Sequence, residues 1–141
     1  MADTTPIDTV AFILIEQDAV LAEKRKLDKC IEPGKVAIPG GKVEAGESRQ
    51  EALKRELKEE LGIEQGESIY VCSLLYKAEQ VLRINYYWIL AWTGKLECHE
   101  AEELLWVPLA QPQILDCKVD RIALELCKKM ASDLKQSEVL E

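Results

Sequence analysis

The sequence contains a single histidine and five cysteines, which is too few, at these spacings, for a familiar metal motif. The cysteines form no C-x-x-C pair and do not line up with His99 at a zinc-like spacing. Their odd number and lack of pairing argue against a disulfide framework and favour a reducing, cytoplasmic setting. His99 has no partner at the spacing of a nucleophile, so we expect it to be structural or incidental.

Long hydrophobic runs and positive charge are also scarce. The runs "VAFILI" and "YYWILAW" are much shorter than the roughly 20 residues that cross a membrane. We expect no membrane segment, and no secretory signal because no basic and then apolar region opens the chain. The net charge is −8, which argues against a nucleic-acid polymer as partner. A small anionic substrate is still compatible with this charge, because bound cations can reverse the local field.

What is present is an ordinary globular composition, with 48% apolar and 31% charged residues. We predict one domain over residues 1–141, with loose termini at 1–8 and 136–141. The pattern predicts a strand hairpin at 9–25, a short strand at 36–38 and a helix at 48–62. After these it predicts a strand pair at 68–94, a further strand at 103–109 and a second helix at 116–135. This order indicates an α/β fold with a mixed sheet between two helices.

Acidic side chains crowd one side of the first predicted helix. Glu56, Glu59 and Glu60 fall within an arc of about 100° on a helical wheel. This arc adjoins an apolar stripe of leucines, which places the carboxylates at the edge of the packed body. One interpretation is a solvated face with ion pairs to Arg55. The other is a cation site, because the upstream turn "IPGGKVEAGES" could add a backbone carbonyl to the hard oxygen ligands that Mg²⁺ or Mn²⁺ prefers.

The segment "GKVEAGESRQEALKRELKEELGI", residues 41–63, resembles the signature of the Nudix family, G-x5-E-x7-R-E-U-x-E-E-x-G-U, in which U is a bulky aliphatic residue. Every defined position is filled, by Gly41, Glu47, Arg55, Glu56, Leu57, Glu59, Glu60, Gly62 and Ile63. The resemblance implies an α/β/α sandwich that hydrolyses nucleoside diphosphates linked to another group with the help of Mg²⁺, for which Mn²⁺ is a possible substitute.

The resemblance also implies roles for particular residues. Glu56, Glu59 and Glu60 match the metal-binding carboxylates, and the carbonyl of Gly40 matches a backbone metal ligand. Arg55 matches the arginine that holds a carboxylate in place. Glu47 matches the earlier glutamate of the signature, which supports the loop by hydrogen bonding.

A further acidic residue lies downstream of the signature. Glu100 stands six residues before Trp106, where the MutT subgroup carries a glutamate that binds metal or activates water. Glu97, Glu102 and Glu103 are competitors for this role. Either Glu56 or Glu100 could accept the proton of the attacking water.

The rest of the substrate site is less clear from the sequence. Lys24 and Arg25 could contact phosphates, and Tyr86 or Trp88 could stack on a base, although surface charge and core packing are the simpler interpretations. We expect hydrolysis of a nucleoside triphosphate, such as an oxidised purine nucleotide, to a monophosphate and pyrophosphate. The alternatives are a pyrophosphatase for ADP-ribose, a nucleotide sugar or a dinucleoside polyphosphate, and a non-catalytic nucleotide sensor. The resemblance also suggests a homodimer.

Overall fold

The computed structural model describes residues 5–27 and 33–140, with side chains described as far as residue 135. Its elements follow the order β1 (Ile7–Ile13), β2 (Ile15–Glu16), β3 (Ala19–Lys24), β4 (Val36–Ala37), β5 (Gly40–Lys42), α1 (Arg49–Leu61), β6 (Glu64–Gln65), β7 (Ser68–Lys77), β8 (Val81–Ile89), β9 (Trp92–Thr93), β10 (Glu103–Pro108), the 3₁₀ helix η1 (Pro112–Ile114) and α2 (Lys118–Leu140).

The strands form two main sheets. The first has the order β5-β1-β8-β7, and the second pairs β10, β3 and β2, with β4 also on β3. In the first sheet β1 runs parallel to β8 and antiparallel to β5, so the sheet is mixed. β7 and β8 form the antiparallel pair that the sequence predicts. The short strands β6 and β9 pair separately.

The predicted N-terminal hairpin is only partly right. A tight two-residue turn does join β2 to β3, where Gln17 and Asp18 both have positive φ, as such a turn requires. However, β1 does not pair with β3. The chain leaves the first sheet at Leu14, whose carbonyl accepts the amide hydrogen of Leu21. One extended run therefore passes from the first sheet into the second.

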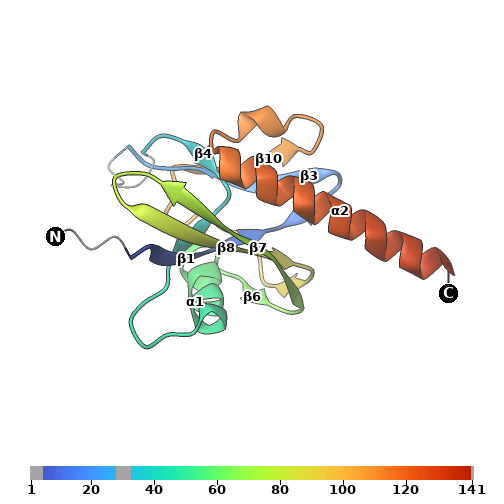
Figure 1. Ribbon diagram of the computed structural model, residues 1–141, viewed down its shortest axis with the longest axis horizontal. Coiled ribbons are helices and arrows are strands. Elements are labelled where there is room, and N and C mark those ends of the chain that lie inside the picture. The colour runs from blue at the N-terminus through green and yellow to red at the C-terminus, as the bar shows by residue number, and fades with distance from the viewer. Residues whose placement is uncertain (1–4, 28–32, 141) are drawn as a thin grey trace.

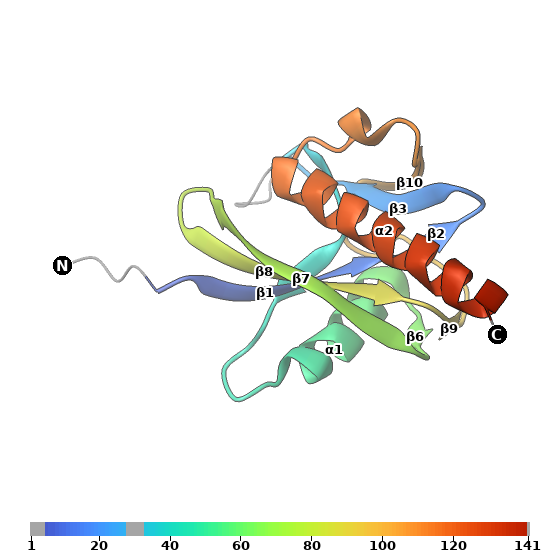
Figure 2. The same cartoon turned by 45° about the vertical axis from the view of Figure 1, so that its right-hand side comes forward.

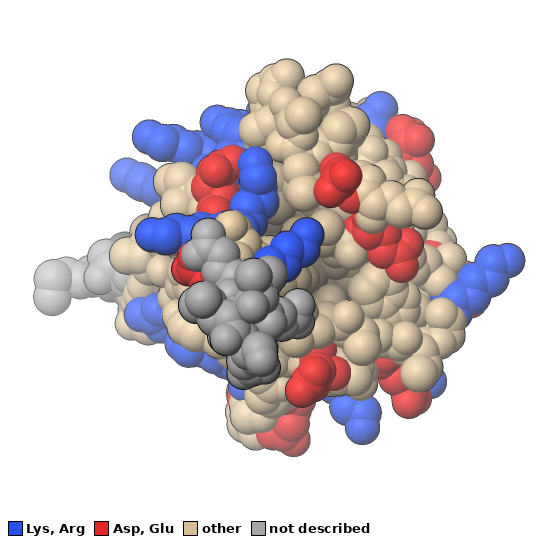
Figure 3. All heavy atoms as spheres, turned by 90° about the vertical axis from the view of Figure 1, so that its right-hand side faces the viewer, with Lys and Arg blue, Asp and Glu red and all other residues tan. Residues whose placement is uncertain are grey.

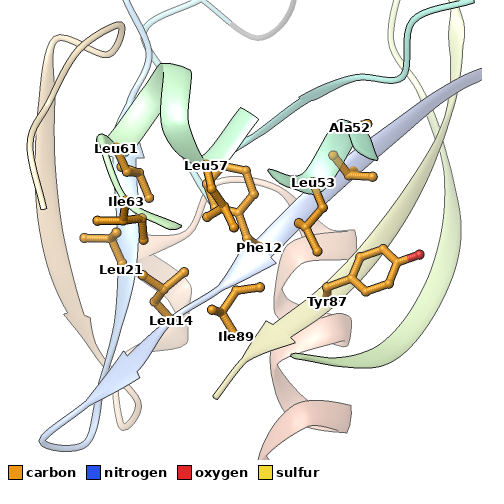
Figure 4. Packing of buried hydrophobic residues seen from close by; sticks show 11 residues of the cluster. Phe12, Leu14, Leu21, Ala52, Leu53, Leu57, Leu61, Ile63, Tyr87 and Ile89 are labelled. Atoms are coloured by element: carbon orange, nitrogen blue, oxygen red, sulfur yellow. The ribbon is translucent and has the colours of Figure 1, made fainter. Parts of the chain in front are cut away.

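The two long helices lie on opposite sides of the first sheet, as expected (Figures 1 and 2). α1 packs on β1 and β5, and α2 packs on β7. Two buried clusters result, one on each side. The α1 cluster, drawn in Figure 4, places the leucines of the helix against residues from the strands, namely Val10, Phe12, Leu14, Leu21, Ala52, Leu53, Leu57, Leu61, Ile63, Tyr87 and Ile89.

Both ends of α1 are set by local sequence. The Ser48 side chain accepts a hydrogen bond from the Glu51 amide, and the Glu51 side chain accepts one from the Ser48 amide. This capping box satisfies two amides that the helix would leave unpaired. At the other end Gly62 adopts the left-handed conformation, with φ 71°. Both features agree with the prediction.

Secondary structure reaches into both terminal segments that the sequence predicts to be loose. β1 begins at Ile7, inside the segment expected to be loose, and α2 continues to Leu140 through most of the expected frayed tail. Residues 1–4 and 141 lie outside the described residues.

α2 extends beyond the body of the protein (Figure 1). Figure 3 shows the face toward which it points, where acidic and basic groups are both present and most of the basic groups gather toward one side. Within residues 5–27 and 33–140, no helix has both the length and the apolar character needed to cross a membrane.

Candidate active site

The glycine-rich turn brings β5 unusually close to its neighbours. Gly40 pairs with Ala11 of β1, and a Cβ at position 40 would lie only 2.2 Å from the carbonyl oxygen of Val10. On the helix side, a Cβ at Gly41 would lie 2.1 Å from the carboxyl carbon of Glu56. Neither position has room for a side chain. The two glycines therefore allow β5 to lie close to both β1 and α1.

Arg55 connects the turn to the acidic face of α1. Its guanidinium donates two hydrogen bonds to Glu47, at 2.7 and 2.9 Å, and one to the carbonyl of Lys42 at 2.9 Å. It also donates to Glu56 at 2.8 Å and to Glu59 at 3.0 Å. The bonded guanidinium holds the pKa of Glu47 at about 2. Arg55 therefore orients three carboxylates at once.

Glu56 and Glu60 are buried, with 7% of each residue exposed. Burial raises the pKa of both carboxyls, and that of Glu60 reaches about 10 because nearby acidic groups add to the effect of burial. The Oε2 atom of Glu60 is buried and has no hydrogen-bond partner within residues 5–27 and 33–140. Glu59 differs, because 47% of its side chain is exposed at the rim. The ion-pair interpretation thus holds for Glu59 but not for Glu60.

Glu100 is the acidic residue of the following loop that approaches this group. It is half-buried, and its charge raises the pKa of both Glu56 and Glu60. Of its competitors, Glu97 places a carboxylate oxygen 3.8 Å from Nε2 of His99, at the C-terminal end of α1. Glu102 donates its amide to the carbonyl of Lys24 and leads into β10, which begins at Glu103.

Glu23 also belongs to this group, although sequence reasoning missed it. It is 3% exposed at the end of β3 and is a main cause, after burial, of the raised pKa of Glu60. Arg25 donates to it at 3.1 Å. The available signal was a charged residue directly after the buried run Val20 to Ala22, where a solvated side chain is not expected.

The chemistry of these side chains fits a divalent cation. A buried oxygen without a partner, surrounded by other carboxylates, is costly unless a positive charge is supplied. Glu56, Glu60 and Glu100 would hold the cation, with Glu59 at the rim. In the described part of the chain, no three or more His, Cys, Asp or Glu side chains stand together in an arrangement that could hold a metal ion, so binding would require these side chains to move. Ligation by the Gly40 carbonyl stays a prediction.

A cavity of about 260 Å³ opens on the other side of β5. Its walls are mainly apolar, with Arg25, Lys42 and Asp120 as charged members, and its lining residues are Thr9, Val10, Ala11, Arg25, Ala37, Ile38, Gly40, Gly41, Lys42, Tyr76, Leu82, Ile84, Cys117 and Asp120. Gly41 therefore borders the cavity and also contacts Glu56. The cavity and the acidic group meet at this glycine.

Asp120, in the first turn of α2, is the buried acid of the cavity, with 4% of the residue exposed. Its two oxygens accept hydrogen bonds from the Tyr86 hydroxyl at 2.5 Å and from the Ile38 amide at 3.0 Å. Burial raises its pKa to about 6, against the opposite effect of these two bonds. From the sequence alone, Asp120 is indistinguishable from any other acidic residue near the start of a helix.

The four residues expected to bind substrate are placed differently from one another. Of these four residues, only Arg25 is among the described residues that line the cavity. The hydroxyl of Tyr86 donates a hydrogen bond to Asp120, which lines the cavity. Trp88 packs against the buried cluster on the α2 side of the first sheet. Lys24 ends β3 and accepts the Glu102 amide through its carbonyl.

Comparison with known proteins bears on the family and the fold of this chain. A model of the NUDIX domain matches residues 5–126. The CTP pyrophosphohydrolase of Escherichia coli is 35% identical over 101 residues, which cover 71% of this chain and 74% of that protein. The 8-oxo-dGTP diphosphatase of Haemophilus influenzae is 37% identical over 76 residues, covering 50% of this chain and 52% of that protein.

Solved structures are similar over more of the chain. The solution structure of the E. coli ORF135 protein has a TM-score of 0.77 at 27% identity and covers 92% of this chain and 94% of its own. A MutT Nudix hydrolase from Burkholderia pseudomallei has a TM-score of 0.75 at 27% identity, covering 86% of this chain and 98% of its own. With the match to the domain family over most of its length, this chain belongs to the Nudix family of hydrolases, which generally require divalent metal ions.

Proposed function

We propose that this protein hydrolyses a nucleoside triphosphate to a nucleoside monophosphate and pyrophosphate, with Mg²⁺ as the cofactor and Mn²⁺ as a substitute. The observation that carries the proposal is the position of Gly41 between the cavity and the carboxylate of Glu56. A nucleoside in the cavity would extend its phosphates past this glycine toward the acidic group. Arg25 and Lys42, at the cavity wall, supply positive charge for those phosphates.

The volume of the cavity supports one nucleoside over two. At about 260 Å³ it is slightly below the roughly 300 Å³ at which small-molecule sites usually begin. A dinucleoside polyphosphate would need a second site for its other base. The relatives named for CTP and 8-oxo-dGTP also act on single nucleotides.

The side chains have separate tasks in this reaction. When bound, the divalent cation screens the phosphate charge and lowers the pKa of a coordinated water. Glu56, Glu59, Glu60 and Glu100 would hold the cation, and Arg55 keeps Glu56 in the required orientation. Glu100 accepts the proton of the attacking water, because one oxygen of Glu56 is already occupied by Arg55. Among the described residues, no hydrogen bond or ion pair holds the carboxylate of Glu100.

A substrate panel tests the proposal. Purified protein is incubated with CTP, 8-oxo-dGTP, ATP, ADP-ribose and a dinucleoside tetraphosphate, each with Mg²⁺, with Mn²⁺ and with EDTA. The expected result is a monophosphate and pyrophosphate from triphosphates, with activity lost in EDTA. Faster cleavage of ADP-ribose or the dinucleotide would support the pyrophosphatase alternatives. Tight binding without turnover in either metal would support the sensor. A homodimer and a cytoplasmic location stay predictions.

A further inference from the structure

The loop between β9 and β10 attaches to the C-terminal turn of α1. The last carbonyls of a helix have no partners within the helix. The loop supplies them, because the Glu97 amide donates to the Leu61 carbonyl at 2.9 Å and the His99 amide to the Glu60 carbonyl at 3.1 Å. The imidazole of His99 adds a third contact, with Nδ1 3.2 Å from the carbonyl oxygen of Glu59.

The imidazole packs directly over Gly62. A Cβ at this position would lie 3.0 Å from Cε1 of His99 and 3.4 Å from Nε2. The absence of a side chain at Gly62 therefore serves two purposes, since it permits the left-handed φ of 71° and leaves space for the ring. His99 is not part of the core, because 41% of its side chain is exposed.

Glu100 follows His99 directly, so the ring contact lies one residue from the acidic group. On the other side of Glu100, the Glu102 amide is bonded to the carbonyl of Lys24 at 2.9 Å. The backbone is thus attached to α1 before Glu100 and to β3 after it. Among the described residues, the carboxylate of Glu100 has no hydrogen-bond or ion-pair partner, so its position depends on these backbone attachments.

We propose that His99 is a positioning residue, which holds Glu100 beside Glu56 and Glu60 by donating a hydrogen bond from Nδ1 to the Glu59 carbonyl. The bond requires the hydrogen to be on Nδ1. This role rests on the proposed function, in which Glu100 accepts a proton. A shift of about 1 Å in such a group can lower turnover by about 100-fold without weakening substrate binding.

Paired substitutions of His99 test the hydrogen bond. Asparagine places an amide nitrogen close to the position of Nδ1, whereas alanine removes the donor. We expect His99→Ala to lower kcat by about 10- to 100-fold with KM within about 2-fold, and His99→Asn to recover most of kcat. Lys95→Ala, an exposed change in the same loop, is the control and should keep wild-type kcat. Wild-type kcat in His99→Ala, or no recovery in His99→Asn, would overturn the proposal.

A double-mutant cycle tests whether His99 acts through Glu100. In a Glu100→Gln background, His99→Ala should reduce kcat no further, because the group that it positions is already disabled. A merely structural histidine would reduce kcat by the same factor in both backgrounds. Equal factors would therefore refute the positioning role.

Hydrogen exchange gives a readout that needs neither metal nor substrate. The peptide covering residues 95–102 should exchange several-fold faster in His99→Ala than in wild type, and His99→Asn should restore the slow rate. Unchanged exchange in His99→Ala would refute the anchoring of the loop. If the wild type hydrolysed no nucleotide, the proposed function would fail, and this measurement alone would decide whether His99 orders Glu100.

Discussion

The carboxylate of Glu56 lies directly against Gly41, so closely that a Cβ on the glycine would be 2.3 Å from both carboxylate oxygens. A second restraint comes from Arg55, whose guanidinium donates a hydrogen bond to Oε1 of Glu56 at 2.8 Å. The position of this carboxylate is therefore determined jointly by a missing side chain on β5 and by a neighbouring residue of α1.

Gly41→Ala should accordingly displace Glu56 and abolish most turnover. We expect kcat to fall by at least about 100-fold, because the added methyl group occupies the place of a carboxylate that must be positioned within a fraction of an ångström. Steady-state kinetics measure the loss, and far-UV circular dichroism confirms that the protein is folded. Gly46→Ala is the comparison, because no described atom beyond its chain neighbours lies within 4 Å of a Cβ there. Its positive φ of 78° should cost about 1–2 kcal/mol of stability, but kcat should stay close to that of wild type. Equal kcat values for Gly41→Ala and wild type would contradict the assigned position of Glu56.

Glu60→Gln should separate catalysis from stability. Turnover should fall by about 100-fold or more, because a charged cation ligand is lost. In EDTA, however, the variant should be as stable as wild type or more so at alkaline pH. The pKa of Glu60 rises from 4.5 to about 10 on folding, so wild type loses stability as the pH rises between these values, whereas glutamine does not titrate.

Urea unfolding in EDTA at pH 5 and pH 9 measures this difference, alongside kinetics with Mg²⁺. Glu64→Gln is the matched control, because Glu64 is 60% exposed and pairs only with Lys58 among the described residues. A folded Glu60→Gln variant with turnover near wild type would refute the proposed cation site.

The acidic face of α1 could be predicted because its geometry depends on one helix. On the helical wheel Glu60 lies nearest to the leucine stripe and Glu59 farthest from it. The structure follows this order, since Glu60 is buried and Glu59 is largely exposed. The capping residues of α1 were equally predictable, because each contact spans only a few residues.

The remaining contacts depend on which distant segments meet. Glu23 and Glu60 come from β3 and α1, and the hydrogen bond from Tyr86 to Asp120 spans 34 residues. A strand's alternation of polar and apolar residues shows which face it buries but does not identify its partner. For the same reason the parallel pairing of β1 with β8 was not predicted, and β1 was assigned to a hairpin with β3.

Arg55→Lys should be a severe change despite the conserved charge. A lysine can supply one of the contacts that the guanidinium makes, but it cannot donate in a planar pair to Glu47 and also reach Glu56. We expect kcat to fall by about 10- to 100-fold and the Mn²⁺ concentration for half-maximal activity to rise. Arg49→Lys, at the exposed ion pair with Asp8, is the control and should change kcat by less than about 2-fold. Equal effects of the two substitutions would remove Arg55 from its proposed role.

Tyr86→Phe should destabilise the protein more at pH 8 than at pH 5. Asp120 has a pKa of about 6, above its usual 3.8. Its contribution to the free energy of unfolding is therefore complete below pH 3.8 and declines as the pH rises through about 6. Above that pH the carboxylate is charged, and losing the hydroxyl of Tyr86 then costs about 1 kcal/mol more than when it is neutral. Urea unfolding at both pH values measures this difference. Tyr87→Phe, on the other face of β8, should show no such pH dependence.

Ile84→Trp should fill the cavity and weaken substrate binding without disabling the chemistry. Ile84 lines the cavity, whereas the acidic group lies beyond Gly41 on the α1 side, so an added indole would compete with the nucleoside but not with the phosphates. We expect KM to rise by about 10-fold or more while kcat changes by less than about 3-fold. Leu75→Trp adds the same side chain where 61% of the residue is exposed and should leave KM unchanged. A wild-type KM in Ile84→Trp would place the nucleoside outside this cavity.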